Sequence, residues 1–272
     1  EELELATGIA NQTAIALSNI SMQRKMIEQR TFEREMEIAR EIQCRLLPRK
    51  MPEIPGYDFA AINAPAKQVG GDYYDFLSLS EDELGIAIAD VSGKGVPAAI
   101  LIASVRSALQ AEGRAGIQSV VSLLEHLNEL VYRDTASDMF VTMVFSILHP
   151  SSGLFQYANA GHPYPLLFTH DGEYVELEIG GCFLGIGEKM QYGCGTAILA
   201  PGGTLILYSD GVTDTQSPNG DLYGRKRLIE VAQKNLDGTA ENLLKAIVAD
   251  TKKYQGDAEQ FDDFTLVVVR RN

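Results

Sequence analysis

The chain has 272 residues, 45% of them hydrophobic, which suffices for a packed core in one large domain or two. Its 23 Lys and Arg residues against 37 Asp and Glu residues give a formal net charge of −14, which disfavours nucleic acid and anionic membranes as partners. No apolar stretch approaches the roughly 20 residues that a membrane-spanning helix needs. The three cysteines lie far apart without CxxC spacing, so we expect a cytoplasmic protein with neither a zinc site nor a disulfide framework.

The first 47 residues have the composition of a long helix. They contain no proline and one glycine, Gly8, and we predict one long helix or two, ended by the prolines from Pro48 onward. A narrow apolar seam favours pairing with a second copy, hence a homodimer, over packing of the helix on its own domain. The seam consists of Ile9, Thr13, Ala16, Ile20 and Ile27. The start without Met is what we expect of a fragment.

Beyond Gly56, short β-type runs bounded by Gly, Asp, Asn and Pro are interleaved with helical stretches. Several strands follow one another directly, which predicts hairpins and mainly antiparallel sheets. The helices are too few to alternate with every strand, so a layered α+β fold is favoured over a doubly wound parallel sheet. The predicted strands are 58–64, 75–79, 85–90, 140–149, 154–158, 165–169, 204–208 and 265–270, and the predicted helices are 97–110, 117–133, 225–234 and 240–254.

Four aspartates lie where a strand-like run meets a turn: Asp72, Asp90, Asp210 and Asp262. Strand ends present side chains from a rigid scaffold, so we expect one shared, highly charged site. Asp90 and Asp210 end runs too apolar to accept an unpaired charge, and the adjacent Asp262 and Asp263 would repel each other without a cation nearby. Each aspartate alone is more often a turn or cap residue, so the prediction depends on the combination.

Aspartate sites without His or Cys favour Mg²⁺ or Mn²⁺ over zinc. Two such ions about 4 Å apart can polarise a bridging water and stabilise both the attacking and the leaving oxygen at phosphorus. The acids therefore predict phosphoester hydrolysis. The segment from Ser92 to Gly95 is no nucleotide-binding P-loop, because it lacks the earlier glycine and has no Ser or Thr after its lysine.

Five motifs stand in the order known from one family: PAKQVGGDYYDF, IADVSGKGVPAA, NAGHPYPLL, YSDGVTD and DDFTLVVV. The segment that contains them resembles the metal-dependent protein Ser/Thr phosphatases of the PPM family, in the bacterial RsbU/SpoIIE branch. The resemblance implies a four-layer α-β-β-α sandwich of two antiparallel sheets flanked by helices, with a dinuclear Mn²⁺ or Mg²⁺ site at one edge. It divides the chain into a helical linker, residues 1–50, and a phosphatase domain, residues 51–272.

The same resemblance implies a ligand set for two ions. Its members are Asp72, Asp90, the carbonyl of Val91, Asp210 and Asp262, with Asp263 beside them. The choice between Asp262 and Asp263 as the direct ligand stays open, because the family varies at the second of these positions.

For three further residues, a functional role competes with an ordinary structural or surface role. Lys67 could contact the substrate phosphate, but a lone lysine is usually a solvated surface residue. His162 could be a general acid or a turn residue that fixes its loop. Asp214 could support the acid site or only end a turn.

For function, the resemblance implies hydrolysis of phosphoserine or phosphothreonine on an anti-anti-sigma protein of the STAS type in a partner-switching pathway, by direct attack of water without a phospho-enzyme. The segment LATGIANQTAIALSN resembles the closing helix of a GAF sensor domain, and the following stretch up to LLP resembles a sensor-to-phosphatase linker. The chain would then be the output end of a receptor. The alternatives are a catalytically silent dimeric scaffold, against which the intact acid set argues, and a two-metal nucleotidyl enzyme, whose nucleotide-binding features are missing.

Overall fold

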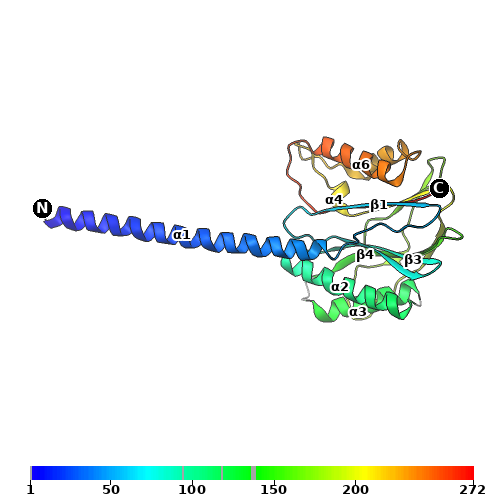
Figure 1. Ribbon diagram of the computed structural model, residues 1–272, viewed down its shortest axis with the longest axis horizontal. Helices are drawn as coiled ribbons and strands as arrows, with labels where there is room; N and C mark the ends of the chain where they lie inside the picture. Colours follow the sequence, from blue (N-terminus) through cyan, green and yellow to red (C-terminus); the bar gives the residue numbers. More distant parts are fainter. Residues whose placement is uncertain (1, 94, 118, 136–138) are drawn as a thin grey trace.

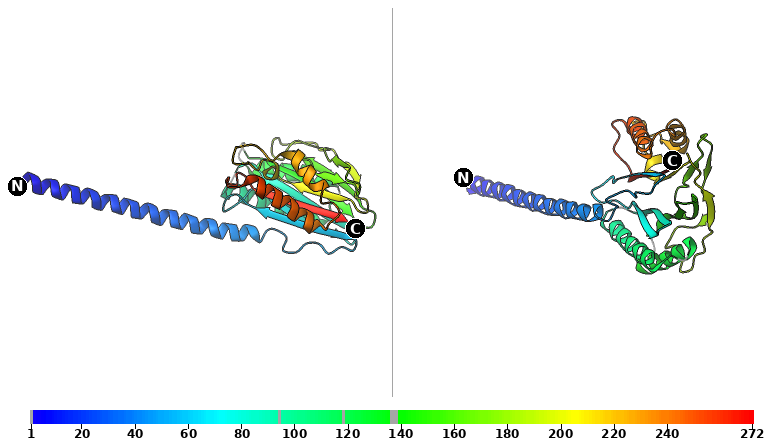
Figure 2. Two further views of the ribbon diagram at one scale, coloured as in Figure 1. Left: turned by 90° about the horizontal axis from the view of Figure 1, so that it is seen from above. Right: turned by 45° about the vertical axis from the view of Figure 1, so that its right-hand side comes forward.

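Helix α1 (Glu2–Cys44) extends as one continuous helix away from the folded remainder and meets it through its last turns (Figures 1 and 2). The computed structural model describes residues 2–93, 95–117, 119–135 and 139–272. In the predicted seam, Ile20 and Ile27 are 51% and 64% exposed, whereas the side chain of Ile9 lies outside the described residues. The prediction of a long helix is confirmed, and pairing stays a prediction.

Two sheets form the centre of the molecule. The first has the order β1-β11-β10-β6-β7 and the second β2-β3-β4-β5-β8, with β9 also paired to β5. Neighbouring strands are antiparallel except for β5 and β8. The strands are β1 (Tyr57–Ala64), β2 (Tyr73–Ser80), β3 (Glu83–Val91), β4 (Val141–His149), β5 (Leu154–Ala160), β6 (Leu166–Phe168), β7 (Tyr174–Glu176), β8 (Gly180–Gly181), β9 (Gly195–Ile198), β10 (Thr204–Tyr208) and β11 (Phe264–Arg271).

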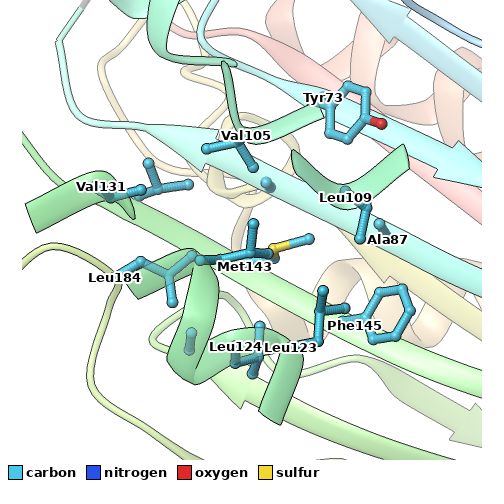
Figure 3. Packing of buried hydrophobic residues seen from close by; sticks show 14 of the residues in the cluster. Tyr73, Ala87, Val105, Leu109, Leu123, Leu124, Val131, Met143, Phe145 and Leu184 are labelled. Carbon is cyan, nitrogen blue, oxygen red and sulfur yellow. The ribbon is translucent and has the colours of Figure 1, made fainter. Parts of the chain in front are cut away.

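Helices cover the outer face of each sheet. Helices α2 (Val96–Ala115) and α3 (Val120–Asp134) pack on the second sheet, where Leu124 and Phe145 meet in a buried cluster (Figure 3). The short α4 (Asp210–Thr213), α5 (Gly224–Gln233) and α6 (Ala240–Gln255) pack on the first sheet. A third cluster fills the space between the sheets. The expected four-layer α-β-β-α sandwich is confirmed.

Strand β11 contains an apolar run and lies in the middle of the first sheet, between β1 and β10. Its side chains alternate, so that Leu266 and Val268 face the helix-covered cluster while Val267 and Val269 face the space between the sheets. Because both faces are buried, the stretch from Leu266 to Val269 is apolar at every position and shows no polar alternation. Each such side chain contributes about 1.5–3 kcal/mol through burial.

The predicted strands and helices all form, with ends shifted by a few residues. Helix α3 begins later than predicted, because Ser119 is its N-cap and its Oγ accepts a hydrogen bond from the Ser122 amide. The prediction missed β7, β8, β9 and α4, which have two to four residues each. Elements this short show no usable hydrophobic period.

None of the helices in the described part of the chain is both long enough and apolar enough to cross a membrane.

Candidate active site

The predicted acids come from the ends of strands in both sheets. Asp72 directly precedes β2 and Asp90 lies near the end of β3; Tyr73 pairs with Ala89, so Asp72 and Asp90 face each other one step further along the same register. Asp210 follows β10 and opens α4, and Asp262 lies just before β11, the strand paired with β10. Each sheet therefore contributes a pair of acids.

The electrostatics of Asp90 tie the two pairs together. Burial first, and then the negative charges of Asp210, Asp262 and Asp263, raise the pKa of Asp90 to about 7, although a hydrogen bond with Asp72 acts in the opposite direction. Charges affect a buried pKa this way when they lie within a few ångströms. The structure thus brings Asp72, Asp90, Asp210, Asp262 and Asp263 into one site. Full ionisation of all five carboxyl groups at neutral pH is energetically unfavourable unless a cation compensates the charge.

Of the two acids from the second sheet, Asp72 is more buried than Asp90, with 4% of its surface exposed. Burial and then the charge of Asp90 raise the pKa of Asp72 well above its usual value, while hydrogen bonds from Ser209 and Thr265 oppose the rise. Among the described residues, its Oδ2 is buried without a hydrogen-bond partner. A buried polar atom left unpaired costs about 1–3 kcal/mol, and more when it is charged. This oxygen is suited to a cation.

Gly71 keeps the space beside these oxygens open. A Cβ atom at position 71 would stand 2.8 Å from the Val91 carbonyl oxygen and 3.2 Å from Oδ1 of Asp90. The first distance is shorter than real Cβ contacts, so a side chain here would fill the space next to both oxygens. The absence of a side chain leaves the Val91 carbonyl and the Asp90 carboxylate accessible to a ligand.

The adjacent Asp262 and Asp263 have different surroundings. Asp263 is 5% exposed, and its two carboxylate oxygens accept hydrogen bonds from the backbone amides of Ala66, at 2.7 Å, and Gly71, at 2.6 Å. The half-buried Asp262 accepts a hydrogen bond from the Asp263 amide through Oδ1, at 2.9 Å. Asp263 thus holds the loop before Asp72, an arrangement that favours Asp262 as the metal ligand.

His162 is buried close to Asp90. Its Nδ1 lies 2.9 Å from Oγ1 of Thr142, whose hydroxyl also contacts the Asp90 carbonyl oxygen at 3.3 Å. Burial lowers the pKa of His162 to about 3. The ring is therefore neutral at neutral pH, which argues against the general-acid alternative and for a role in fixing the end of β3.

A cleft of about 640 Å³ opens beside Asp90 and Asp210. His162 and Asp214 line it, and so does Arg225, whose Nη1 lies 2.5 Å from Oε2 of Glu176. Arg225 is a cationic residue near the acids that the sequence did not reveal, because nothing in the motif LYGRKR links it to aspartates elsewhere in the chain. The exposed Lys67 is not among the residues that line this cleft.

In the described part of the chain, no three Asp, Glu, His or Cys side chains already surround one point closely enough to hold a metal ion. The donors nevertheless fit a hard divalent cation. They comprise the unpaired Oδ2 of Asp72, the open Val91 carbonyl and the Asp90 carboxyl, whose pKa is raised by burial and neighbouring charge. Oxygen donors of this kind suit Mg²⁺ or Mn²⁺.

The chain matches known proteins over most of its length. Residues 80–272 match the family model of stage II sporulation protein E, SpoIIE. Phosphoserine phosphatase RsbU of Bacillus subtilis is 35% identical over 244 residues, which are 89% of this chain and 72% of RsbU.

Solved structures agree with this match. The RsbU and RsbW domains of a Mycobacterium tuberculosis protein superpose with a TM-score of 0.69 at 30% identity, covering 81% of this chain and 61% of that one. The SiaA-PP2C domain of Pseudomonas aeruginosa superposes with a TM-score of 0.80 at 23% identity, over 90% of this chain and 98% of that one, and shares the fold. The chain belongs to the SpoIIE family and is a protein serine/threonine phosphatase.

Proposed function

We propose that the phosphatase uses two Mn²⁺ or Mg²⁺ ions held by the acid site. The ligands in this proposal are Asp72, Asp90, the Val91 carbonyl, Asp210 and Asp262. Asp263 is better placed to fix the loop before Asp72, because both of its carboxylate oxygens already accept backbone hydrogen bonds. The observation that carries the proposal is the buried, unpaired Oδ2 of Asp72 beside Asp90, whose pKa is raised to about 7.

When bound, the ions would lower the pKa of water and neutralise charge on the phosphoryl group. The chain's own residues determine where the substrate lies. The cleft beside Asp90 and Asp210 leads to the acids, and Arg225 provides a positive charge on its wall. Without cations, the acid cluster would repel a phosphate dianion, so activity should depend strictly on added metal.

We further propose that the substrate is a phosphoserine or phosphothreonine on a STAS-type anti-anti-sigma protein in a partner-switching pathway. Two relatives support this class. RsbU, at 35% identity, is a phosphoserine phosphatase, and the Mycobacterium tuberculosis relative carries an RsbU domain together with an RsbW domain. A homodimer through α1 is part of the proposal, supported by exposed apolar residues on that helix such as Ile20 and Ile27. The GAF-type sensor upstream and the cytoplasmic location stay predictions.

The test is phosphate release from a panel of phosphorylated STAS proteins, with Mn²⁺ and with a chelator. An unrelated phosphoserine protein serves as the control substrate. We expect rapid release from at least one STAS protein with Mn²⁺, slower release from the control, and none with the chelator. Equal rates on all substrates would contradict the substrate class, and release in the presence of chelator would contradict the metal requirement.

A further inference from the structure

The last turn of α1 contacts the loop that carries Asp72. Gln43 donates a hydrogen bond from Nε2 to the Gly70 carbonyl oxygen, at 2.6 Å, and its Oε1 accepts one from the Gly70 amide, at 3.0 Å. One side-chain amide thus pairs with both backbone groups of a residue 27 positions away. Two hydrogen bonds from one side chain constrain the orientation of the loop as well as its distance from the helix.

The other side of the same loop is held by Asp263. Its carboxylate binds the amides of Ala66 and Gly71, and a Cβ atom at position 70 would stand 2.5 Å from its Oδ2. Gly70 and Gly71 have no side chains of their own to anchor the loop. The backbone before Asp72 therefore takes its position from two residues distant in sequence, Gln43 and Asp263.

Gln43 is itself well anchored. After α1 ends, the Leu46 amide donates to the Gln43 carbonyl oxygen at 2.8 Å, and Leu47 packs against buried clusters on both faces of the second sheet. Figure 1 shows this end of α1 beside α2, with which it makes contact. The glutamine head group is thus presented from a rigid element, which favours precise positioning of its partner.

We propose that Gln43 is a positioning residue for the phosphatase reaction. It holds the loop of Gly70 and Gly71 so that Asp72 and the Val91 carbonyl are arranged to receive the ions. The inference rests on the proposed function, because the role of Asp72 as a ligand belongs to that proposal. Through Gln43, the end of α1 then contributes to the metal affinity of the acid site.

The test uses the full chain with Gln43→Met, which keeps side-chain length and helix propensity but removes both hydrogen bonds. Gln43→Glu is the second variant, because a carboxylate cannot donate to the Gly70 carbonyl. Gln29→Met is the matched control: Gln29 lies on the same helix and bonds Glu33, one turn further along that helix. Mn²⁺ affinity is measured by calorimetry, exchange of the Gly70 and Gly71 amides by NMR, and kcat and KM separately.

Loss of the two hydrogen bonds should weaken Mn²⁺ binding about tenfold or more and speed exchange of the Gly70 amide by a similar factor, since each neutral bond stabilises by roughly a factor of two to ten. At saturating substrate and limiting Mn²⁺, kcat should fall while KM stays within twofold. The control should match the wild type in all readouts. If Gln43→Met fails to fold, the Mn²⁺ affinity of Gln43→Glu decides, because its carboxylate still accepts from the Gly70 amide but no longer donates to the Gly70 carbonyl.

Mn²⁺ affinity and Gly70 exchange within twofold of wild type in folded Gln43→Met would overturn the inference, and so would Mn²⁺ affinity within twofold of wild type in Gln43→Glu where Gln43→Met does not fold. If the wild type itself binds no Mn²⁺, the proposed function falls, and amide exchange alone then decides the inference. Faster exchange of the Gly70 amide in Gln43→Met and not in Gln29→Met supports it, and unchanged exchange in Gln43→Met overturns it.

Discussion

At the scale of single residues, the acid site combines groups that need a cation with groups that fix the backbone around it. Burial and neighbouring negative charge raise the pKa of both Asp72 and Asp90, whereas the Asp263 carboxylate already accepts hydrogen bonds from two amides. A buried carboxylate without a partner is costly unless a proton or a metal compensates it. This difference separates the proposed ligands from the residue that supports them.

Asp90→Asn and Asp210→Asn should each lower Mn²⁺-dependent phosphate release by about 100-fold or more, because each removes a charged donor from the proposed metal site. The measurement is the initial rate on a phosphoserine protein at saturating Mn²⁺. Asp221→Asn, an exposed acid before α5, is the control and should keep nearly full activity. Full activity in both site variants would refute the assignment.

The raised pKa of Asp90 also predicts how stability depends on pH without metal. An unfolded aspartate titrates at about 3.9, whereas Asp90 in the folded chain titrates at about 7. Between these values the folded protein binds more protons than the unfolded chain, so the free energy of unfolding falls as pH rises through this window. We expect the Tm of the metal-free protein to decrease from pH 5 to pH 8.

Two comparisons check this origin of the pH dependence by thermal melts. Mn²⁺ should restore the Tm at pH 8, because the cation replaces the proton as the compensating charge. Asp90→Asn should reduce the pH dependence in the absence of metal, since an amide does not titrate, and the raised pKa of Asp72 accounts for part of what remains. A metal-free wild type whose Tm rose steadily from pH 5 to pH 8 would contradict the electrostatic picture.

Some of the site could be predicted from residues and some could not. Asp72, Asp90, Asp210 and Asp262 stand at strand ends, a feature visible in the hydrophobic pattern. The distinction between Asp262 and Asp263 depends on amides almost 200 positions away, which no local pattern contains. Likewise, the motif around His162 does not show that the ring is buried and neutral.

At the scale of elements, α1 differs from every other helix because its apolar residues stay exposed over most of its length. Exposed apolar surface of this extent marks an interaction site. Deletion of residues 1–34 should therefore abolish self-association in sedimentation experiments and keep the last turns with Gln43. The remaining domain should change its Tm by less than about 3 °C, the shift that roughly 1 kcal/mol causes in a domain of this size.

A truncated chain with the same dimer fraction as the full chain would contradict the proposed role of α1. The matched control is Ile20→Leu, which keeps apolar surface at an exposed position of the helix. It should retain self-association.

The sequence predicts best those elements that are long enough for their buried positions to form a recognisable hydrophobic pattern. Strand β11 is apolar at each central position because both of its faces are covered, and α3 buries one stripe of leucines, including Leu123, Leu124 and Leu127. Strand β8 consists of two glycines, and its pairing with β5 is a result of tertiary packing. A pattern of two residues cannot specify such a pairing.

At the scale of the whole molecule, the sandwich brings two strand ends from each sheet to one acid site, and α1 contacts the loop before Asp72 through Gln43. Strand and helix counts predict a layered α+β fold, whereas the four-layer order was implied by the resemblance to the phosphatase family. The convergence of the acids was predictable only in outline, because the relative placement of two sheets depends on side-chain packing between them.

The most direct test of the metal-dependent account is anomalous diffraction from crystals grown with Mn²⁺, recorded at the manganese absorption edge. The account predicts two anomalous peaks among Asp72, Asp90, Asp210 and Asp262, with at least one lost in crystals of Asp90→Asn. The absence of any peak at these aspartates in fully Mn²⁺-soaked, active crystals, or peaks confined to another part of the molecule, would contradict it.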